Sequence, residues 1–386
     1  MHNIVIGHSL YPPHILGGAE ISTKILAECM SKHLKVNVLT VGDQRDAIVR
    51  ETQNEVSIVR LPAKNIFWYG DKDKQSNFNI RRWHVQDIYA NYYYKQIRNE
   101  LERINPTLIH TQKIAGFSLA VWKAAHDLKI PIVHTLRDYS LLYPRYYRLP
   151  AIYFTKYVNA VIGLSQYTLD EHLASKMFTN SAKYVVPNAI KGIATPKNKV
   201  RHGEPLIVGY FGRLAEDKGV SFLIEAIKGL PDTIVKELRI YGEGPFGEQL
   251  IKEAIGDKRI IFAGKKKELE VQIAMADVDI TVVPSKWNEP FGRVIIESYE
   301  VGTPVIASNI GGIPEVILDK SYLVDVGQPE AIQKALYEYY HLDENKKETL
   351  REICLEHSNS FSEENLIKRQ LEIYDLVLKE SNHVNR

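Results

Sequence analysis

The sequence contains few cysteines and no long apolar segment. Its two cysteines, Cys29 and Cys354, are too few for a disulfide scaffold or for a zinc site built from cysteine. No run of about 18 apolar residues occurs, so we expect no helix that spans a bilayer. The start of the chain shows no pattern of a secretory signal, which favours a cytoplasmic location, with at most a peripheral contact at the inner face of the membrane.

Three common ligand-binding motifs are also missing. Gly7 is followed by His8-Ser9-Leu10, so the G-x-G-x-x-G dinucleotide fingerprint is absent, and no P-loop sequence occurs. The segment from Gly163 to Tyr167 lacks the second glycine of a nucleophile elbow. These absences disfavour a nicotinamide-dependent oxidoreductase, a P-loop enzyme and a serine hydrolase.

The net charge of +2 conceals two oppositely charged halves. Residues 1–192 contain 24 Lys and Arg against 15 Asp and Glu, a net charge of +9. Residues 193–386 contain 25 against 32, a net charge of −7. This asymmetry indicates two domains with different partners.

Strands alternate with helices in both halves, which predicts two α/β domains with doubly wound, Rossmann-like parallel sheets. In residues 1–192 we expect strands at 4–6, 36–40, 57–61, 108–110, 132–134, 160–164 and 183–186, and helices at 20–33 and 89–104. Residues 193–203 are polar and read as a linker. In residues 204–361 we expect strands at 206–211, 238–241, 260–262, 280–283, 304–307 and 322–324, followed by a helix in residues 362–386. Two such domains are expected to face each other across a cleft, with ligands beyond the carboxyl ends of the strands.

Two glycine-containing loops are candidates for binding a diphosphate. Gly17-Gly18-Ala19-Glu20 precedes a predicted helix, where free backbone N–H groups attract anions, although a plain flexible turn is the alternative. The loop from Gly212 to Gly219 follows a predicted strand and carries Arg213 and Lys218. These two cations could neutralise a leaving diphosphate without a metal, or they could simply be solvated.

The segment from Val283 to Glu297 carries the strongest signal. It runs from a strand through a Pro-Gly loop into a helix, with Glu289 in the loop and Glu297 eight residues later. That separation is roughly 12 Å on a helix, close to the distance between a sugar and a ribose across a diphosphate. Carboxylates accept hydrogen bonds from paired hydroxyls, and N–H groups near Phe291, Gly292, Arg293 and Val294 could meet the phosphates.

The first half offers further candidates at its strand ends. Arg137 and Asp138 follow a predicted strand and could face a ligand or form a structural ion pair. His110 and His134 each end a predicted strand. A histidine at such a position can either pack in the core or take part in catalysis. The D-x-D sequences Asp71-Lys72-Asp73 and Asp277-Val278-Asp279 do not follow a strand's carboxyl end, so we expect no metal site.

Basic and aromatic residues in the first half are candidates for contacting an acceptor. They occur in Phe67-Trp68-Tyr69 through Arg81-Arg82-Trp83 and in the segment from Tyr143 to Arg148, which includes Arg145. Aromatic faces stack on sugars, and arginines attract phosphates or anionic headgroups. A solvated loop is the alternative, and nucleic acid is not expected because no reading module accompanies the charge.

Taken together, these motifs resemble the family 4 retaining glycosyltransferases of the GT-B architecture, also called group 1. The resemblance extends over nearly the whole chain. It rests on Gly17-Gly18-Ala19-Glu20, His110, Val185-Val186-Pro187-Asn188, the 209–219 loop, Tyr241-Gly242-Glu243-Gly244-Pro245, Glu289-Pro290-Phe291-Gly292 with Glu297, Gly302-Thr303-Pro304-Val305-Ile306-Ala307, and Gly311-Gly312-Ile313-Pro314-Glu315.

The resemblance implies transfer of a sugar from a UDP- or GDP-linked donor, with no cofactor or obligatory metal. Glu297 would hold the ribose, Glu289 the sugar hydroxyls, and Arg213 and Lys218 the diphosphate. Gly18 would approach the phosphate from the other domain, and the C-terminal helix would pack back on the first domain. The implied donor-binding residues are Gly17, Gly18, Glu20, Gly212, Glu243, Phe291, Gly292, Arg293, Val294 and Glu297; the implied catalytic residues are Glu289, Arg213, Lys218, Arg137 and Asp138; and the acceptor candidates are His110, Trp68, Arg81, Arg82, Arg145 and Arg148.

Three positions depart from the family pattern. Arg137-Asp138 stands where the family commonly has His-Asp, Gln112 stands where a second histidine often follows His110, and Asn188-Ala189 replaces Asn-Gly. A guanidinium cannot act as a neutral hydrogen-bond acceptor, so we interpret Arg137 as a sugar or phosphate contact. The acceptor is expected to be a saccharide or a lipid-linked saccharide. A GT-B sugar-nucleotide epimerase, a phosphorylase and a non-catalytic sugar-nucleotide-binding protein remain alternatives.

Overall fold

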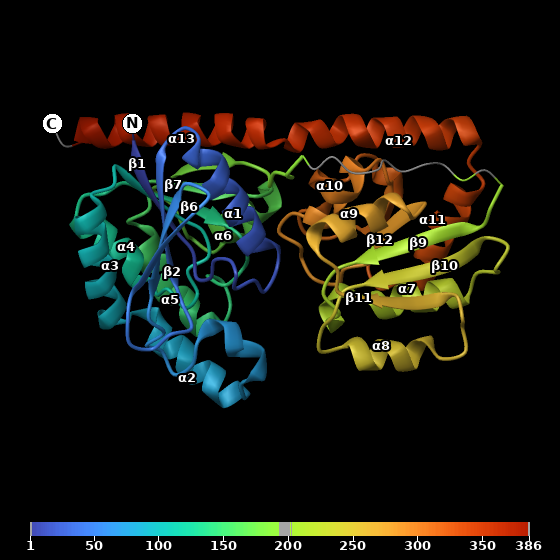
Figure 1. The fold of residues 1–386 in the computed structure, drawn as a ribbon, viewed down its shortest axis with the longest axis horizontal. Coiled ribbons are helices and arrows are strands. Elements are labelled where there is room, and N and C mark those ends of the chain that lie inside the picture. Colours follow the sequence, from blue (N-terminus) through green and yellow to red (C-terminus); the bar gives the residue numbers. More distant parts are fainter. Residues whose placement is uncertain (1, 193–200, 202, 385–386) are drawn as a thin grey trace. The chain divides into compact units, whose positions relative to one another are not determined.

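The computed structural model describes residues 2–192, 201 and 203–384, so most of the predicted linker lies outside the described residues. The chain divides into two compact units. The first unit comprises Met1–Ala189 and Glu363–Arg386, and the second comprises Ile190–Ser362. Both units have the predicted α/β architecture, with helices on both faces of a sheet (Figure 1).

An eight-stranded sheet forms the centre of the first unit, in the order β3-β4-β2-β1-β5-β6-β7-β8. The strands are β1 (Asn3–Gly7), β2 (Lys35–Val41), β3 (Val49–Gln53), β4 (Val56–Leu61), β5 (Leu108–Thr111), β6 (Ile132–Leu136), β7 (Ala160–Gly163) and β8 (Ala182–Val185). The helices are α1 (Gly18–Ser31), α2 (Asn77–Ile88), α3 (Asn91–Ile104), α4 (Ala120–Asp127), α5 (Arg145–Thr155), α6 (Gln166–Ala174) and α13 (Glu363–Val384), with a 3₁₀ turn η1 at Tyr69–Lys74.

The edge strand β3 corrects the expectation of a wholly parallel sheet. It pairs antiparallel with β4 through a turn at Asn54 and Glu55, both of which have positive φ. All five residues of β3 are exposed, so its sequence lacks the alternation of apolar and polar residues that marks a half-buried strand.

Alternating residues of β1 show how the sheet builds a core on each face. Ile4 and Ile6 pack in one cluster with side chains of α1 and α13, such as Met30 and Val377. Val5 points to the opposite face, into a cluster with residues of α3 and α4, including Trp122. The helix α13 is therefore an integral layer of the first unit, packed beside α1 (Figure 1).

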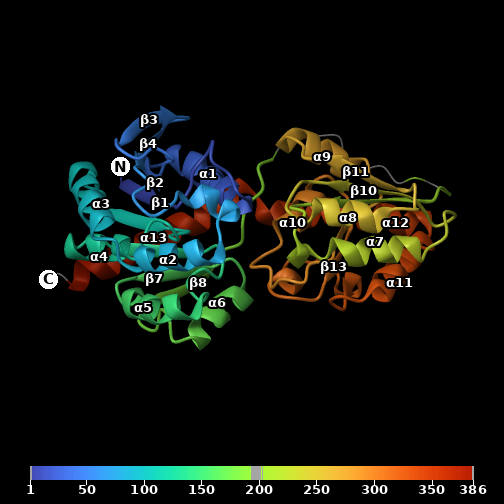
Figure 2. The ribbon, with the colours of Figure 1, turned by 90° about the horizontal axis from the view of Figure 1, so that it is seen from below.

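The second unit contains a six-stranded parallel sheet in the order β11-β10-β9-β12-β13-β14. Its strands are β9 (Leu206–Phe211), β10 (Val235–Tyr241), β11 (Ile260–Gly264), β12 (Ile280–Val283), β13 (Val305–Ser308) and β14 (Leu323–Val324). Its helices are α7 (Val220–Lys228), α8 (Gly247–Ala254), α9 (Glu268–Ala276), α10 (Arg293–Glu300), α11 (Pro329–Tyr340) and α12 (Glu344–Ser358), which lie on the two faces of the sheet (Figure 2).

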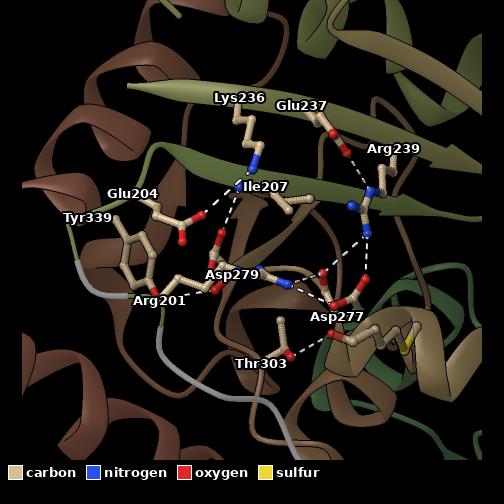
Figure 3. Close-up of polar contacts among 11 residues, drawn as sticks. Arg201, Glu204, Ile207, Lys236, Glu237, Arg239, Asp277, Asp279, Thr303 and Tyr339 are labelled. Atoms are coloured by element: carbon tan, nitrogen blue, oxygen red, sulfur yellow. Dashed lines mark hydrogen bonds and ion pairs between the residues drawn. The ribbon is translucent and has the colours of Figure 1, made fainter. Parts of the chain in front are cut away.

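The D-x-D sequence before β12 takes part in a network of arginine contacts. Arg201 lies 2.8 Å from Asp277 Oδ1 and 3.1 Å from Asp279 Oδ1, and Arg239 lies 2.7 Å from Asp277 Oδ2 (Figure 3). Asp279 also accepts a 2.7 Å hydrogen bond from the N–H of Ile207, the second residue of β9. These carboxylates therefore fasten the segments that enter the sheet. No helix in the described part of the chain is long and apolar enough to cross a membrane.

Buried histidines make the first unit sensitive to acid. Burial lowers the pKa of His8 and of His134 to about 3, and that of His84 to about 4, all below the ordinary value of 6.5. Below pH 6.5 these histidines are therefore protonated in the unfolded chain but not in the folded unit. The free energy of unfolding consequently decreases as the pH decreases. Asp87 acts in the opposite sense because burial raises its pKa to about 7, but one carboxyl group offsets only one histidine.

We predict that the free energy of unfolding decreases as the pH falls from 7 to 4. Each of these histidines contributes up to about 1.4 kcal/mol per pH unit in the range where only the unfolded chain binds its proton. Urea unfolding at several pH values, followed by tryptophan fluorescence, measures the slope. His134→Gln should reduce the slope, because it removes one of the groups whose pKa burial lowers. A slope that is the same in wild type and His134→Gln would contradict the assignment.

Candidate active site

Four loops of the second unit meet at the carboxyl edge of its sheet. The strands β9, β10, β12 and β13 are parallel neighbours, so the loops that follow them start at the same edge. These loops comprise residues 212–219, 242–246, 284–292 and 309–312. The residues that the sequence predicts for binding a nucleotide-sugar donor in this half lie in these loops or in the first turns of α10.

Lys218 and Glu289 form an ion pair at this edge. The Nζ of Lys218 lies 2.5 Å from Oε1 of Glu289, and the hydroxyl of Ser285 donates to the same oxygen at 2.8 Å. Both charged side chains are largely buried, with 26% and 17% exposed. The sequence predicts both residues for the site but on separate loops, and only the structure joins them.

The backbone holds these two loops close together. The carbonyl of Asp217 accepts hydrogen bonds from the N–H groups of Lys286 and Trp287, at 2.9 and 3.2 Å. Gly219 has a φ of +67°, and a Cβ there would lie 2.0 Å from the carbonyl oxygen of Pro284. A residue other than glycine at position 219 would therefore push apart the loops that carry Lys218 and Glu289.

A pair of glycines after β13 holds the backbone of Glu289. The N–H of Gly312 donates to the carbonyl of Glu289 at 2.7 Å. Gly311 has a φ of +60°, and a Cβ there would lie 2.6 Å from the backbone N and O of Glu289. The resemblance to the family includes this Gly-Gly sequence, and the structure shows that it contacts Glu289.

Arg213 and Glu243 come from two adjacent loops. The N–H of Leu214 donates to the carbonyl of Glu243 at 3.0 Å, and a Cβ on Gly242 would lie 1.8 Å from the carbonyl oxygen of Gly212. The guanidinium of Arg213 is about half exposed and lies 4.0 Å from Asp217. The carboxylate of Glu243 is exposed and pairs with Lys265 at 3.0 Å. Arg213 thus lies on the same loop as Lys218, with its cationic group accessible.

The start of α10 contains a second, partly buried ion pair. The Nε of Arg293 donates to Oε1 of Glu297 at 2.6 Å, across one turn of the helix. The side chain of Phe291 is buried against Phe361, with ring centroids 5.8 Å apart, so Phe291 can offer a ligand only its backbone. Val294 follows in the first turn and is partly buried.

The glycine loop of the first unit is held by Glu20. The N–H of Gly17 donates to Oε2 of Glu20 at 2.8 Å, and the side chain of Glu20 is 1% exposed. The carboxylate of Glu20 is therefore buried and supports the loop, and a direct contact between Glu20 and the donor stays a prediction. Gly17 has extended backbone angles, and a Cβ there would meet no atom within 4 Å. The chain itself therefore does not require glycine at position 17, whereas close approach by a ligand would.

Lys113, which the sequence does not single out, is a charged residue at the carboxyl edge of the first unit's sheet. It follows β5, and its Nζ lies 3.5 Å from Asp138 Oδ2 and 3.8 Å from Glu20 Oε1. Burial lowers the pKa of Lys113, but Tyr69, Asp138 and Glu20 outweigh burial and raise it above the ordinary value. Burial likewise raises the pKa of Asp138, while Lys113 and Ser140 lower it overall. A lone lysine after a strand has no sequence signal, because both of its partners are distant in the chain.

Arg137 contacts Gln112, which also departs from the family pattern, and Asn188, which directly precedes the departing Ala189. Its Nε donates to Oε1 of Gln112 at 2.6 Å, and its Nη1 donates to Oδ1 of Asn188. Gln112 is held in turn by the hydroxyl of Thr23 at 3.0 Å. The departures at positions 112 and 137 are therefore coupled by direct contact. A role for Arg137 and Asp138 in the reaction stays a prediction.

His110, an acceptor candidate, lies in the core of the first unit. Its ring is fully buried, with Nδ1 2.7 Å from the hydroxyl of Tyr374 on α13 and Nε2 2.7 Å from the hydroxyl of Thr135. Burial holds the pKa of His110 well below its ordinary value. Both ring nitrogens are occupied by contacts that fasten α13 and β6 to β5, which favours the packing role, and a contact with the acceptor stays a prediction.

The remaining acceptor candidates lie outside the core. Arg81 and Arg82 are exposed on α2, Arg145 is exposed on α5, and Arg148 is partly buried on the same helix. Trp68 is partly buried, and its ring lies edge-on to that of His14, with centroids 4.7 Å apart. By contrast, the neighbouring aromatic residues Phe67, Tyr69 and Trp83 form a buried cluster.

Comparison with known proteins shows to which family the chain belongs. Residues 16–191 match the family described as "Glycosyltransferase Family 4", and residues 193–353 match "Glycosyl transferases group 1". A Klebsiella pneumoniae protein described as "Uncharacterized 42.6 kDa protein in cps region" is 30% identical over 84% of this chain and 90% of its own length. The chain belongs to the group 1 glycosyltransferases.

Further relatives of this glycosyltransferase cover part of the sequence or share its fold. The D-inositol 3-phosphate glycosyltransferase of Corynebacterium glutamicum is 34% identical over 44% of each chain. Sucrose-phosphate synthase from Thermosynechococcus elongatus has a TM-score of 0.78 at 18% identity, covering 98% of this chain and 100% of its own. Anabaena HepE in complex with UDP and glucose has a TM-score of 0.73 at 20% identity, covering 97% and 100%. These neighbours confirm the predicted GT-B fold.

We predict that Lys113→Met destabilises the glycosyltransferase by about 3 kcal/mol, because it leaves two neighbouring carboxylates without their cation. Urea unfolding at pH 7 measures the loss. Lys123→Met is the matched control, because Lys123 pairs with Asp127 across one turn of α4 on the surface and should cost less than about 1 kcal/mol. Equal stability losses in the two variants would contradict a supporting role for Lys113.

Proposed function

We propose that the protein is a retaining, metal-independent hexosyltransferase that uses a nucleotide-diphosphate sugar. The observation that carries this proposal is the Lys218–Glu289 pair beside Arg213, at the edge of a parallel sheet where ligands of this fold class bind. Two cations on one loop suit a diphosphate, and a carboxylate anchored by Lys218 and Ser285 suits sugar hydroxyls. The UDP present in the HepE structure supports a UDP-linked donor, with GDP as the alternative.

The proposed chemistry needs no side-chain nucleophile. The bond between the sugar's anomeric carbon and the diphosphate oxygen breaks while the acceptor hydroxyl approaches on the same face. A phosphate oxygen takes the proton of that hydroxyl. Arg213 and Lys218 stabilise the negative charge that develops on the leaving diphosphate, and they are already positioned before the reaction begins.

The acceptor is proposed to be a saccharide or a lipid-linked saccharide. The similarity to a cps-region protein supports a place in cell-envelope or exopolysaccharide synthesis. A cytoplasmic enzyme that meets such an acceptor at the inner face of the membrane would need a peripheral membrane contact.

Lys218→Ala and Glu289→Gln should each lower kcat about 10²–10³-fold, because each removes a preorganised charge from the reacting groups. Steady-state kinetics with the best donor measures the effect, and circular dichroism checks the fold. Lys286→Ala is the matched control, since Lys286 lies on the same loop but pairs with exposed Glu216 at 3.4 Å. Near-normal turnover in Lys218→Ala or Glu289→Gln would contradict the assignment.

NMR of the first product should show the donor's anomeric configuration, and inversion would disprove retention. Turnover should also persist in EDTA.

A thermal-shift screen should identify the donor. UDP, GDP, ADP and their common sugar conjugates are added to the purified protein, and a ligand at about 100 times its Kd should stabilise it by about 2.7 kcal/mol. Glu297→Ala should abolish the shift because it removes the proposed ribose acceptor, while Glu248→Ala on α8 should retain it. If a nucleotide sugar binds and is epimerised in the absence of an acceptor, the protein is a sugar-nucleotide epimerase and the proposal of sugar transfer is wrong.

A further inference from the structure

Two neighbouring helices of the first unit, α2 and α5, expose apolar side chains. The helices α2 and α5 pack against each other, and the ring of His84 lies edge-on to Tyr146 and Tyr147 with centroids 6.2 Å apart in each case. Figure 2 shows them side by side, and in Figure 1 α2 lies on the side of the first unit away from α13. We call the outward faces of these two helices, together with Tyr143, the α2–α5 surface.

The outward face of α2 combines apolar and basic side chains. Phe78, Arg81, Arg82 and Val85 follow the spacing of one helix face and are all exposed, Phe78 by 67% and Val85 by 63%. The guanidinium of Arg82 lies 5.7 Å from the ring centroid of Phe78. The inward face of the same helix buries Trp83, so the exposed apolar residues are not needed for the core.

The helix α5 shows the same combination. Tyr146, Leu149 and Tyr153 follow its exposed face, and Leu149 is 70% exposed. Arg145 begins the helix, and Lys156 at its end lies 3.6 Å from the ring centroid of Tyr153. Exposed apolar residues scattered singly are ordinary, whereas a cluster on adjoining helices marks an interaction site.

The charge of the surface identifies the partner. No Asp or Glu occurs between Asp138 and Asp170 or between Asp73 and Asp87. Asp87 itself is buried beneath the two helices, where it accepts from the N–H of Gly116 and from Tyr147. The exposed faces of the two helices themselves are therefore basic as well as apolar. A second copy of the same face would be repelled by this charge, while anionic lipid headgroups over an acyl layer match both properties.

We propose that the α2–α5 surface docks on an anionic membrane. Leu149, Phe78 and Val85 would enter the boundary between headgroups and acyl chains, the tyrosines would lie at headgroup level, and Arg81, Arg82, Arg145 and Lys156 would meet the lipid phosphates. The proposal concerns attachment and stands independently of the sugar transfer, since docking requires neither donor nor acceptor.

Sedimentation of the full chain with vesicles tests the proposal. The protein should pellet with vesicles of phosphatidylglycerol and phosphatidylcholine at low salt, should stay in solution with pure phosphatidylcholine, and should be released at high salt because charge attraction is screened. Phe78→Ser/Leu149→Ser should lower the partition coefficient at least about tenfold. Arg81→Glu/Arg82→Glu/Arg145→Glu should reduce binding to background.

Matched controls come from the second unit. Ile251→Ser/Ile255→Ser removes equally exposed apolar residues from α8 and its C-terminal end, and Lys265→Glu/Lys266→Glu/Lys267→Glu reverses three charges elsewhere. Both should bind like wild type. Failure of the wild type to bind anionic vesicles, or an equal loss in control and surface variants, would overturn the proposal.

One further variant keeps the surface apolar and gives a positive signal on binding, so that its result does not depend on a loss that misfolding could also cause. Leu149→Trp should show a blue-shifted increase in tryptophan fluorescence on adding anionic vesicles, and Ile255→Trp should not. Binding to an acidic protein or RNA without this spectral change would also overturn the membrane assignment. Donor binding by thermal shift should be unchanged in every surface variant, so a failure of docking is distinguishable from a failure of the proposed function.

Discussion

The close packing of the loops after β9 and β12 is the constraint on which the candidate site depends. Gly219 can approach Pro284 only because it lacks a Cβ, and the carbonyl of Asp217 is bonded to the backbone beyond Ser285. This packing brings Lys218 to Glu289, while Gly311 and Gly312 hold the backbone of Glu289 from the other side. The charged groups are thus held by backbone contacts and not by flexible side chains alone, which is what electrostatic preorganisation requires.

At the carboxyl edge of the first unit's sheet, two carboxylates share one lysine. Glu20 and Asp138 come from distant segments, and Lys113 lies between them as a shared cation. Glu20 in turn binds the N–H of Gly17, so the conformation of the glycine loop depends on a lysine nearly a hundred residues away. The coupled pair of Gln112 and Arg137 shows the same principle, because a residue unusual for the family is matched by another that contacts it.

The structure shows where the basic side chains of the first half and the acidic side chains of the second half lie. The excess of basic residues in the first half includes the arginines of α2 and α5, which lie beside exposed Phe78, Val85 and Leu149. In the acidic second half the carboxylates have specific partners, such as Arg201 and Arg239 for Asp277 and Lys218 for Glu289. Net charge therefore says little about either half until each charged group is assigned its neighbours.

Patterns within short segments were enough to predict the alternation of strands and helices, the loops at the carboxyl edge and the family. The sequence predicted Lys218, Glu289 and Arg213 from glycine- and proline-marked loops after apolar strands. The folded chain was needed to show that His110 is a core residue bonded to Tyr374, that Glu20 supports a loop and that Lys113 compensates two carboxylates. It was also needed to show that β3 joins the sheet although all its residues are exposed. Burial and ion pairing arise between segments far apart in the chain, and a local sequence pattern gives no information on such neighbours.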